Sequence, residues 1–431
     1  MKEIKVGIIG FGTVGAGVAE NLVNNHDVIS GRTGINVKLH KVADLDITTD
    51  RGVKIPDGVL TTDTNSLINE CDIVVELIGG TTIAKKFILQ ALEAKKHVVT
   101  ANKALLAIHG KEIFECAAKN NVDVFYEASV AGGIPIIKSL REGLVGNKIN
   151  RIYGIMNGTC NYILTRMERE GVDFEPVLKD AQKLGYAEAE PSLDIDGFDT
   201  AHKTAILSAL AFGEWFGMEP LHVSGIRDIS LFDLKCADEL GYRIKLLAII
   251  KNTDGNVELR VHPTLVPKTA MIANIHEVFN GVMVDGDTVG ETLFYGRGAG
   301  RKATASAVVS DIVDVARNIA SNSIGRVKCF TESKLFNRLV PMDEIKSRYY
   351  LRLTVEDTPG VMAQITAILA ENNINISSLI QHENNDCNKK SVSVILFTSI
   401  AQEKAVQKAV TAIENLSSSL DKVKLLRIED I

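Results

Sequence analysis

Short apolar runs alternate with amphipathic segments over the first 130 residues of the chain. The run KEIKVGIIG ends in glycine and is followed by small and apolar residues at helical spacing, which predicts a strand, a turn and a helix. Further strand-like runs follow at 37–43, 73–78, 97–100 and 122–126, with helix-like segments between them. Strands that alternate with helices pair in parallel through right-handed crossovers. The pattern therefore predicts an α/β fold with a doubly wound parallel sheet over residues 1–130.

The pattern changes twice further along the chain. Residues 131–320 mix polar glycine loops with helical segments and strand-like runs, which predicts an α+β domain for substrate binding, catalysis and dimerisation. Within it, residues 301–320 have one apolar helical face, which we expect to pack back on the first domain. Residues 321–348 are predicted to be a linker. Residues 349–431 show the order strand, helix, strand, strand, helix, strand, which predicts a separate ferredoxin-like βαββαβ module.

The composition is typical of a soluble globular chain. Apolar residues make up 45% of the 431 residues, and 48 Lys and Arg against 54 Asp and Glu give a net charge of −6, which excludes broad nucleic-acid or anionic-membrane binding. No apolar run reaches the roughly 18 residues of a membrane helix, and the apolar N-terminal run passes into a glycine loop rather than a signal cleavage site. Six scattered cysteines predict reduced thiols in a cytoplasmic protein. They are Cys71, Cys116, Cys160, Cys236, Cys329 and Cys387.

The glycine loop between the first predicted strand and helix has the spacing of a dinucleotide fingerprint. It reads Gly10-Phe11-Gly12-Thr13-Val14-Gly15. The first glycine allows a tight turn, the second lets the pyrophosphate approach the backbone, and the third permits close packing of helix on strand. The helix N-terminus would then face the phosphates. The alternative is a plain glycine turn, but position, spacing and context together favour a Rossmann-like cofactor site.

The end of the second predicted strand decides between the two nicotinamide cofactors. Asp44 stands there, and an acid at this place bonds the ribose hydroxyl of NAD. Lys41 and Arg51 are close in sequence, and basic residues would accept the additional phosphate of NADP. The sequence therefore leaves the choice between NAD and NADP open.

The segment from Lys183 to Lys203 concentrates charge before a predicted helix. Its five acids include Glu188 and Asp199, and Asp199 and Lys203 share a helical face because they are four residues apart. An exposed ion pair would explain that pair as well, whereas a calcium loop is excluded because Phe198 would occupy a ligand position. Lys103 follows the strand at 97–100, at the sheet edge where open α/β sheets bind ligands. Taken alone, it would be interpreted as a surface lysine.

Several motifs together resemble homoserine dehydrogenase over residues 1 to about 320. They are GFGTVG, TANK, EASVAGGIPII, MNGTCNYIL and LGYAEAEPSLDIDGFDTAHK, in this order. The carboxy-terminal module is similar to an ACT domain, a small amino-acid-sensing fold. One copy of each module argues against the bifunctional form fused to aspartate kinase. The chemistry itself is then expected to need only residues 1–348.

The resemblance implies reversible NAD(P)-dependent oxidation of L-homoserine to L-aspartate 4-semialdehyde, in threonine, methionine and isoleucine biosynthesis. It implies that Glu188 and Asp199 hold the substrate, that Lys103 bridges cofactor and substrate, and that Lys203 donates and accepts the proton. It adds Gly79 and Gly300 to the cofactor site. Lysines beside the reacting oxygen would stabilise the negative charge that develops there.

The resemblance also implies a cation site and an effector site. A monovalent cation, sodium by preference, would bind Glu127 and the carbonyls of Val130, Gly132 and Ile134, although the same stretch could be a glycine turn that joins the domains. An amino-acid effector would bind at Asp357, Gly360 and Val361. Threonine is favoured over isoleucine and methionine, and the alternative is a module that serves only oligomerisation. Exposed sheet edges in such modules predict a homodimer or homotetramer.

Two other functions remain as alternatives. An ACT-tailed 2-hydroxy-acid dehydrogenase fits less well, because the fingerprint opens the chain and the acidic segment lacks a His–Glu pair. A non-enzymatic sensor of amino acids and NAD would leave the residues from Glu188 to Lys203 unexplained.

Overall fold

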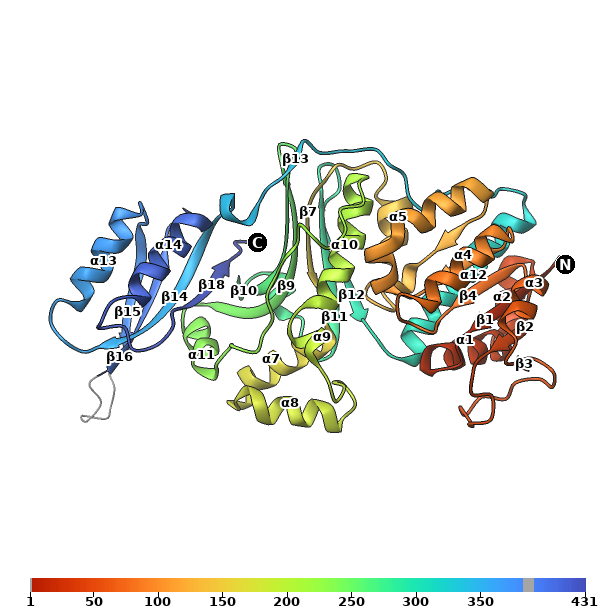
Figure 1. Ribbon diagram of the computed structural model, residues 1–431, viewed down its shortest axis with the longest axis horizontal. Coiled ribbons are helices and arrows are strands. Elements are labelled where there is room, and N and C mark those ends of the chain that lie inside the picture. The colour runs from red at the N-terminus through yellow and green to blue at the C-terminus, as the bar shows by residue number, and fades with distance from the viewer. Residues whose placement is uncertain (1, 383–390) are drawn as a thin grey trace.

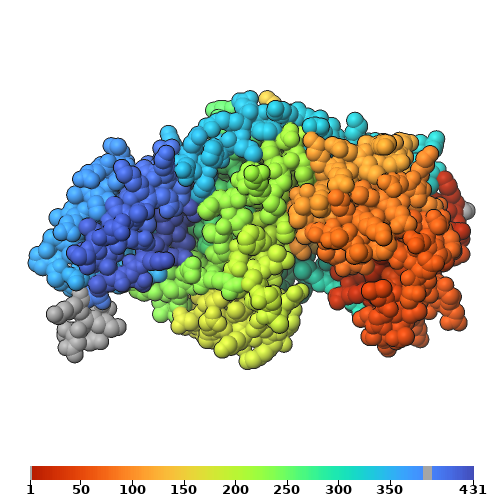
Figure 2. All heavy atoms as spheres, in the orientation of Figure 1, coloured from red at the N-terminus to blue at the C-terminus, as the bar shows by residue number. Residues whose placement is uncertain are grey.

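The computed structural model describes residues 2–382 and 391–431, and Cys387 lies outside them. Three units stand in a row, with the parallel-sheet unit at one end and the C-terminal unit at the other (Figure 1). In the space-filling view, the chain after residue 320 runs along the upper edge of the middle unit to the C-terminal unit (Figure 2). No helix among the described residues is long and apolar enough to span a membrane.

The first unit is the predicted Rossmann-like fold. Its six strands are parallel in the order β3-β2-β1-β4-β5-β6. The strands are β1 (Glu3–Ile9), β2 (Asn36–Ala43), β3 (Leu60–Thr61), β4 (Ile73–Glu76), β5 (His97–Thr100) and β6 (Val124–Phe125). The helices are α1 (Thr13–Asn24), α2 (His26–Thr33), α3 (Thr64–Glu70), α4 (Ile83–Glu93) and α5 (Lys103–Asn120). Helix α12 (Arg301–Ala320) packs on α1, where a Cβ on Gly17 would lie 2.8 Å from the Arg301 side chain.

The middle unit is an antiparallel sheet covered by helices. Strands β12-β11-β7-β9-β10 form it in that order, and β8 and β13 pair with β10. The strands are β7 (Ile149–Ile155), β8 (His222–Val223), β9 (Tyr242–Thr253), β10 (Asn256–Pro267), β11 (Phe279–Gly286), β12 (Gly290–Arg297) and β13 (Arg338–Leu339). The helical elements are η1 (Glu127–Ser129), α6 (Ile136–Lys138), η2 (Ser139–Gly143), α7 (Gly158–Glu170), α8 (Phe174–Lys183), α9 (Ser192–Ile195), α10 (Phe198–Phe212), α11 (Leu231–Glu239) and η3 (Met271–Asn274).

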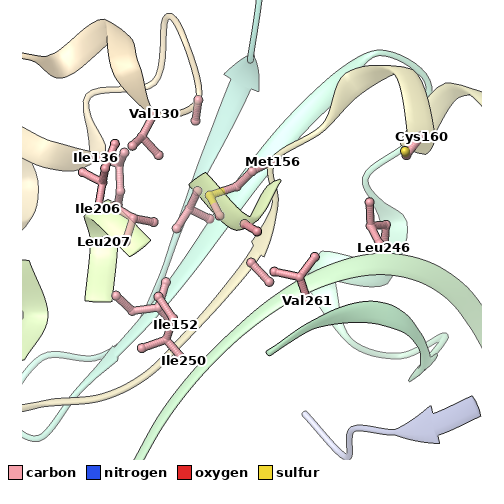
Figure 3. Packing of buried hydrophobic residues seen from close by; sticks show 14 of the residues in the cluster. Val130, Ile136, Ile152, Met156, Cys160, Ile206, Leu207, Leu246, Ile250 and Val261 are labelled. Carbon is pink, nitrogen blue, oxygen red and sulfur yellow. The ribbon is translucent and has the colours of Figure 1, made fainter. Parts of the chain in front are cut away.

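The core of the middle unit lies between α10 and the sheet. Ile206 and Leu207 of α10 lie near Val130 and Ile136, and Ile250 of β9 belongs to the same buried cluster (Figure 3). Helix α10 is buried on most sides, because 12 of its 15 residues are buried, polar and charged ones among them. Any charged residue on this helix is therefore held in place by packing on several sides.

The C-terminal unit has the predicted βαββαβ order. Its sheet runs β18-β14-β16-β15. The elements are η4 (Met342–Glu344), β14 (Lys346–Glu356), α13 (Val361–Glu371), β15 (Ile376–His382), β16 (Ser391–Thr398), β17 (Ala401–Gln402), α14 (Glu403–Glu414) and β18 (Lys424–Ile428).

The C-terminal unit is not a detached module, because its last strand joins the middle sheet. β18 pairs in parallel with β10 at Thr264↔Arg427 and Leu265↔Ile428, which makes one continuous sheet of both units. The segment expected to be a linker also contributes, since β13 lies within it and pairs with β10. The boundary between the middle unit and the C-terminal unit is thus bridged by backbone hydrogen bonds.

Candidate active site

A cavity of about 620 Å³ lies where the parallel sheet meets the middle unit. Residues from both units line it, among them Val14, Lys103, Ala128, Gly132, Met156, Asn157, Gly158, Glu188, Asp194, Asp199, Lys203, Val278, Asn280, Gly298 and Gly300. The carboxyl end of β5 and the N-termini of α5, α7 and α10 all open on this space. Helix N-termini and strand carboxyl ends are where α/β folds bind anionic ligands.

Asp199 is shared by two lysines that come from distant parts of the chain. Lys203 Nζ donates to Asp199 Oδ2 at 2.7 Å and to the carbonyl of Met156 at 2.5 Å. Lys103 Nζ lies 3.1 Å from Asp199 Oδ1. Asn157 donates from Nδ2 to Asp199 Oδ2 at 2.9 Å and to Asp194 Oδ1 at 2.8 Å. The alternative of an exposed Asp199–Lys203 pair is therefore wrong, because both side chains are buried in the cavity wall.

Local structure explains how these groups are held. Gly197 caps α10 in the left-handed conformation (φ +90°), which places Asp199 in the first turn, near the positive end of the helix dipole. Lys203 follows one turn later on the same face. Lys103 opens α5, whose N-cap Asn102 accepts a hydrogen bond from the N–H of Leu105. The two lysines thus reach one carboxylate from two separate units.

The charges stabilise one another. Burial raises the pKa of Asp199, but Lys203 and Lys103 outweigh it and hold this pKa below its ordinary value. The pKa of Lys103 is raised, mainly by the Asp199 charge. Burial and the Asp199 charge raise the pKa of Asp194. The two lysines therefore favour the ionised form of the Asp199 carboxylate, and both of them line the cavity.

The five acids predicted in the 183–203 segment separate into two groups. Glu188, Asp194 and Asp199 line the cavity, and the exposed Glu188 side chain makes no hydrogen bond with any described residue. Glu190 instead accepts a hydrogen bond from Ser192, and Asp196 pairs with Arg227. Glu188 is thus free to bind a ligand ammonium.

The glycine loop leaves room for a pyrophosphate. Gly10 has φ +102°, and a Cβ on Gly15 would lie 1.9 Å from the Gly10 carbonyl oxygen, so both positions require glycine. Gly12 faces open space, and no side chain caps the N-terminus of α1. The free N–H groups and the open approach fit the phosphates of a dinucleotide. Val14 extends the same helix to the cavity wall.

The surroundings of Asp44 bear on the choice between NAD and NADP, which the sequence leaves open. Its carboxylate accepts hydrogen bonds from the N–H groups of Phe11 and Asp46, and so braces the glycine loop. Lys41 is paired with Glu70 at 2.7 Å, and Arg51 is paired with Asp46 at 3.1 Å. Both bases that could receive a 2′-phosphate are therefore already neutralised.

Two further glycines named from the sequence lie at strand and helix ends. Gly79 follows β4 with φ +74° and donates its N–H to Glu76, a fully buried acid that the sequence analysis missed. Glu76 also accepts from Thr100 Oγ1 at 2.7 Å, which ties the ends of β4 and β5 together. An acid inside the apolar run IVVELI was the available signal. Gly300, with φ +112°, caps α12 and lines the cavity.

The 127–134 segment has the features of an oxygen-lined site. Glu127 accepts the N–H groups of Ile137 at 2.8 Å and Lys138 at 2.7 Å, and burial raises its pKa to about 7. Ile134 offers a carbonyl that already accepts the Ile136 N–H. The carbonyls of the buried residues Val130 and Gly132 accept no hydrogen bond from any described residue.

A second cavity, of about 320 Å³, lies in the C-terminal unit. Asp357, Gly360 and Val361 line it together with Gln381 of β15 and Val394 of β16. Gly360 has φ +95° and opens α13, an 11-residue helix without a side-chain cap. A carboxylate placed here would meet free helical N–H groups.

The comparisons with known proteins cover the chain from end to end. Family models match as "Homoserine dehydrogenase, NAD binding domain" over residues 10–127, "Homoserine dehydrogenase" over 135–313 and "ACT domain" over 349–417. The homoserine dehydrogenase of Neisseria gonorrhoeae is 46% identical over 436 residues, with both chains fully covered.

Solved structures agree. A homoserine dehydrogenase from Thiobacillus denitrificans superposes with a TM-score of 0.94 at 45% identity, covering 100% of this chain and 99% of that one. A hyperthermophilic archaeal homoserine dehydrogenase in complex with NADPH has a TM-score of 0.62 at 28% identity, covering 73% of this chain and 97% of that one.

Proposed function

This chain belongs to the homoserine dehydrogenase family and carries a C-terminal ACT domain, and from that premise we propose how its residues perform and regulate the reaction. The enzyme is an oxidoreductase that acts on a CH–OH group with a nicotinamide cofactor. The reaction we assign to the cavity is the reversible conversion of L-homoserine to L-aspartate 4-semialdehyde, a step toward threonine, methionine and isoleucine. The observation that carries this assignment is the Asp199 carboxylate shared by Lys103 and Lys203 at the cavity wall.

Each side chain has a role that follows from its charge and position. A nicotinamide cofactor held at the glycine loop from Gly10 to Gly15 would supply the hydride acceptor or donor. Lys203, as the neutral amine, takes the hydroxyl proton during oxidation and, as the ammonium, returns it to the carbonyl oxygen during reduction. Lys103 donates a hydrogen bond to the same oxygen and stabilises its negative charge. Glu188 binds the substrate ammonium, and Asp199 holds both lysines in reach of the reacting oxygen.

The two alternative functions fit the cavity less well. No histidine is among the described residues that line it, whereas a 2-hydroxy-acid dehydrogenase was expected to use a His–Glu pair. A pure sensor would have no use for a buried lysine held against a carboxylate. Reduction of NAD⁺ or NADP⁺ that depends on L-homoserine, compared with L-lactate, tests the assignment. Failure with L-homoserine and both cofactors, or preference for lactate, would contradict it.

The paired state of Lys41 and Arg51 supports NAD as the preferred cofactor, with Asp44 at the ribose. A carboxylate beside the ribose repels a 2′-phosphate unless a base neutralises it, and here both neighbouring bases have acidic partners. The homoserine assay run with each nucleotide measures this preference directly.

A monovalent cation, sodium by preference, is proposed at Glu127. The donor set fits, because one carboxylate and the unpartnered carbonyls of Val130 and Gly132 are hard oxygen ligands, and Ile134 supplies a third carbonyl. This cation would join the parallel sheet to the middle unit beside the cavity, since Gly132 lines it.

Removal of sodium is expected to lower the thermal stability of the enzyme. An ion that binds only the folded state raises the melting temperature by mass action. We expect a higher Tm in sodium chloride than in choline chloride of equal ionic strength, and no difference for Glu127→Gln. Equal Tm values for the unsubstituted enzyme in both salts would contradict the site.

The ACT domain is proposed to bind an amino-acid effector, threonine by preference. The supporting observation is the 320 Å³ cavity where the N-terminus of α13 and the Asp357 carboxylate face one space, which suits the carboxylate and ammonium of an amino acid. A module for oligomerisation alone would not need such a cavity. The exposed edges β12 and β15 of the continuous sheet support a homodimer or homotetramer. We also propose that the enzyme is located in the cytoplasm.

Asp357→Asn is expected to weaken inhibition by L-threonine at least about tenfold, because a hydrogen bond to a charged group contributes about 1.5–3 kcal/mol. The measurement is the threonine concentration for half-inhibition in the full-length chain. Asp421→Asn changes an exposed acid elsewhere in the same domain and is the matched control. L-Threonine should inhibit this variant as strongly as the unsubstituted enzyme. Equal inhibition of both variants would exclude this effector site, and inhibition by isoleucine or methionine instead would correct the effector.

A further inference from the structure

One wall of the active-site cavity is formed by a loop that a single asparagine fastens from behind. Val278 and Asn280 line the cavity, and the Val278 carbonyl packs so tightly on Gly158 that a Cβ there would lie 2.8 Å from it. Asn161, on α7, donates from Nδ2 to the carbonyls of Ile275, Glu277 and Phe279 at 3.2, 3.0 and 3.1 Å. Three alternate carbonyls of the loop therefore converge on one amide.

Lys245 fixes the orientation of that amide. Its side chain lies on β9 and is 1% exposed, and Nζ donates to Asn161 Oδ1 at 3.0 Å and to the Ile275 carbonyl at 2.6 Å. An ammonium beside Oδ1 keeps the oxygen on its own side and so directs the amide N–H group toward the loop. The lysine, the asparagine and the loop form one hydrogen-bonded unit.

The charged groups around Lys245 leave it without a carboxylate of its own. Glu168 is paired with Arg243 at 2.8 Å, and Glu277 is paired with Arg169 at 2.8 Å. His276, on the loop, also faces the lysine and has a pKa lowered to about 4, first by burial and then by the Lys245 charge.

The titration of Lys245 falls near neutral pH. Burial lowers its pKa to about 7; Glu168 opposes this shift, while Arg243 and Arg169 add to it. Since a neutral amine bonds more weakly than an ammonium, the fastening of the loop depends on pH.

We propose that Lys245 is a positioning residue for the reaction: through Asn161 its ammonium holds the 275–279 loop, and with it the Val278–Asn280 wall, in the shape that binds homoserine. The proposal rests on the assignment of homoserine to this cavity. Substrate binding then weakens as Lys245 loses its proton, while cofactor binding at the glycine loop does not change.

The test compares Lys245→Met with Lys245→Gln. The methionine variant removes the charge and the donor, and we expect the KM for L-homoserine to rise about fivefold to tenfold, the loss of about one to two hydrogen bonds. Its kcat and its Kd for NADH or NADPH, measured by nicotinamide fluorescence, should stay near those of the unsubstituted enzyme. The glutamine variant keeps a hydrogen-bond donor without a charge, so its KM for L-homoserine should lie close to that of the unsubstituted enzyme. In both variants the KM component with a midpoint near pH 7 should disappear.

If Lys245→Gln and Lys245→Met both fold and both keep the KM of the unsubstituted enzyme, or if that pH component survives in them, the proposal is overturned.

A second readout does not need homoserine. The folded-state pKa is below the ordinary value of 10.5, so stability falls as pH falls between about 10.5 and 7 because only the unfolded chain binds the proton. Lys245→Met should lose this slope in denaturant unfolding. A retained slope would contradict the titration, whereas loss of homoserine activity in the unsubstituted enzyme alone would contradict only the proposed function.

Discussion

Replacing Lys203 with methionine is expected to lower kcat for L-homoserine oxidation by about two to four orders of magnitude, the usual contribution of a positioned general acid–base group. Lys203 is the buried amine that Asp199 Oδ2 and the Met156 carbonyl aim from α10 into the cavity wall. Methionine has a similar length and no proton to exchange. Lys103 would still balance the Asp199 charge, so folding should not change greatly.

Lys203→Arg is the matched control for charge. Arginine keeps the positive charge but does not release its proton near neutrality, so the kcat of the arginine variant should fall nearly as far as that of the methionine variant. The Kd for reduced cofactor, measured by fluorescence, should stay unchanged in both variants. The glycine loop lies at the N-terminus of α1, whereas the substituted residue lies on α10. A methionine variant with nearly full kcat would remove Lys203 from the chemistry.

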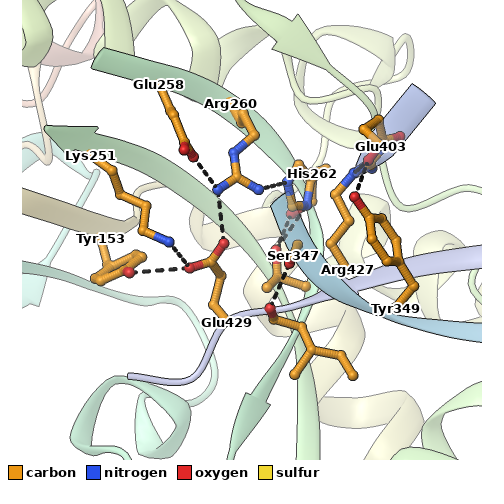
Figure 4. Close-up of polar contacts among 12 residues, drawn as sticks. Tyr153, Lys251, Glu258, Arg260, His262, Ser347, Tyr349, Glu403, Arg427 and Glu429 are labelled. Atoms are coloured by element: carbon orange, nitrogen blue, oxygen red, sulfur yellow. Dashed lines mark hydrogen bonds and ion pairs between the residues drawn. The ribbon is translucent and has the colours of Figure 1, made fainter. Parts of the chain in front are cut away.

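Glu429→Ala is expected to destabilise the whole chain by about 3–5 kcal/mol, the typical effect of removing one partner from a buried ion pair. Glu429 follows β18 and accepts hydrogen bonds from Lys251 at 2.7 Å, Arg260 at 2.9 Å and Tyr153 at 3.1 Å (Figure 4). Arg260 is fully buried and would lose this carboxylate, with only Glu258 left to pair with it. All three partners belong to the middle unit, which carries Asp199 and Lys203.

The measurement is urea unfolding of the full-length chain, and Asp430→Ala is the matched control. Asp430 is the next residue, exposed and paired only with Arg348, so its loss should change stability by less than about 1 kcal/mol. Burial opposes ionisation of Glu429, but Arg260 and Lys251 lower its pKa below the ordinary value. Its stabilisation is thus present above about pH 4.5 and lost as pH falls, and the alanine variant should show a shallower acid limb. Equal effects of both variants would contradict the buried network.

This network leads us to expect that the middle unit depends on residues 349–431 for its stability, although the chemistry was expected to need only residues 1–348. A chain that ends there would lose β18 from the edge of β10 and Glu429 from Arg260, so truncation would damage the catalytic unit together with the effector site. For this reason point substitutions such as Asp357→Asn, rather than truncation, separate regulation from folding.

The first and last units followed from sequence because their patterns are regular. Short apolar strand-like runs alternate with segments of helical period in both of them, and glycine marks the turn at Gly10 and Gly360. Strands β11 and β12 were missed, since FNGVMVDG and GETLFYGR carry glycines that interrupt the apolar pattern. Pairing of β18 with β10 joins residues about 160 positions apart and leaves no local signal.

The site could be predicted only in part for the same reason. The spacing of Asp199 and Lys203 gives one helical face, but nothing local places Lys103 on the same carboxylate. Asn157 lies in the motif MNGTCN, whose pattern assigns it no role, although its amide joins Asp194 to Asp199. Lys245 had a signal in retrospect, as a lone lysine inside the apolar strand RIKLLAII.

The central claim is that Asp199 and Lys203 act as one unit in the oxidation of L-homoserine. A double-mutant cycle of Asp199→Asn and Lys203→Met, with kcat/KM for L-homoserine as the readout, tests it most directly. Each single variant is expected to lose most of the activity, and the double variant is expected to be little worse than the less active single variant. Losses that multiply, or substantial homoserine oxidation by the double variant, would contradict it.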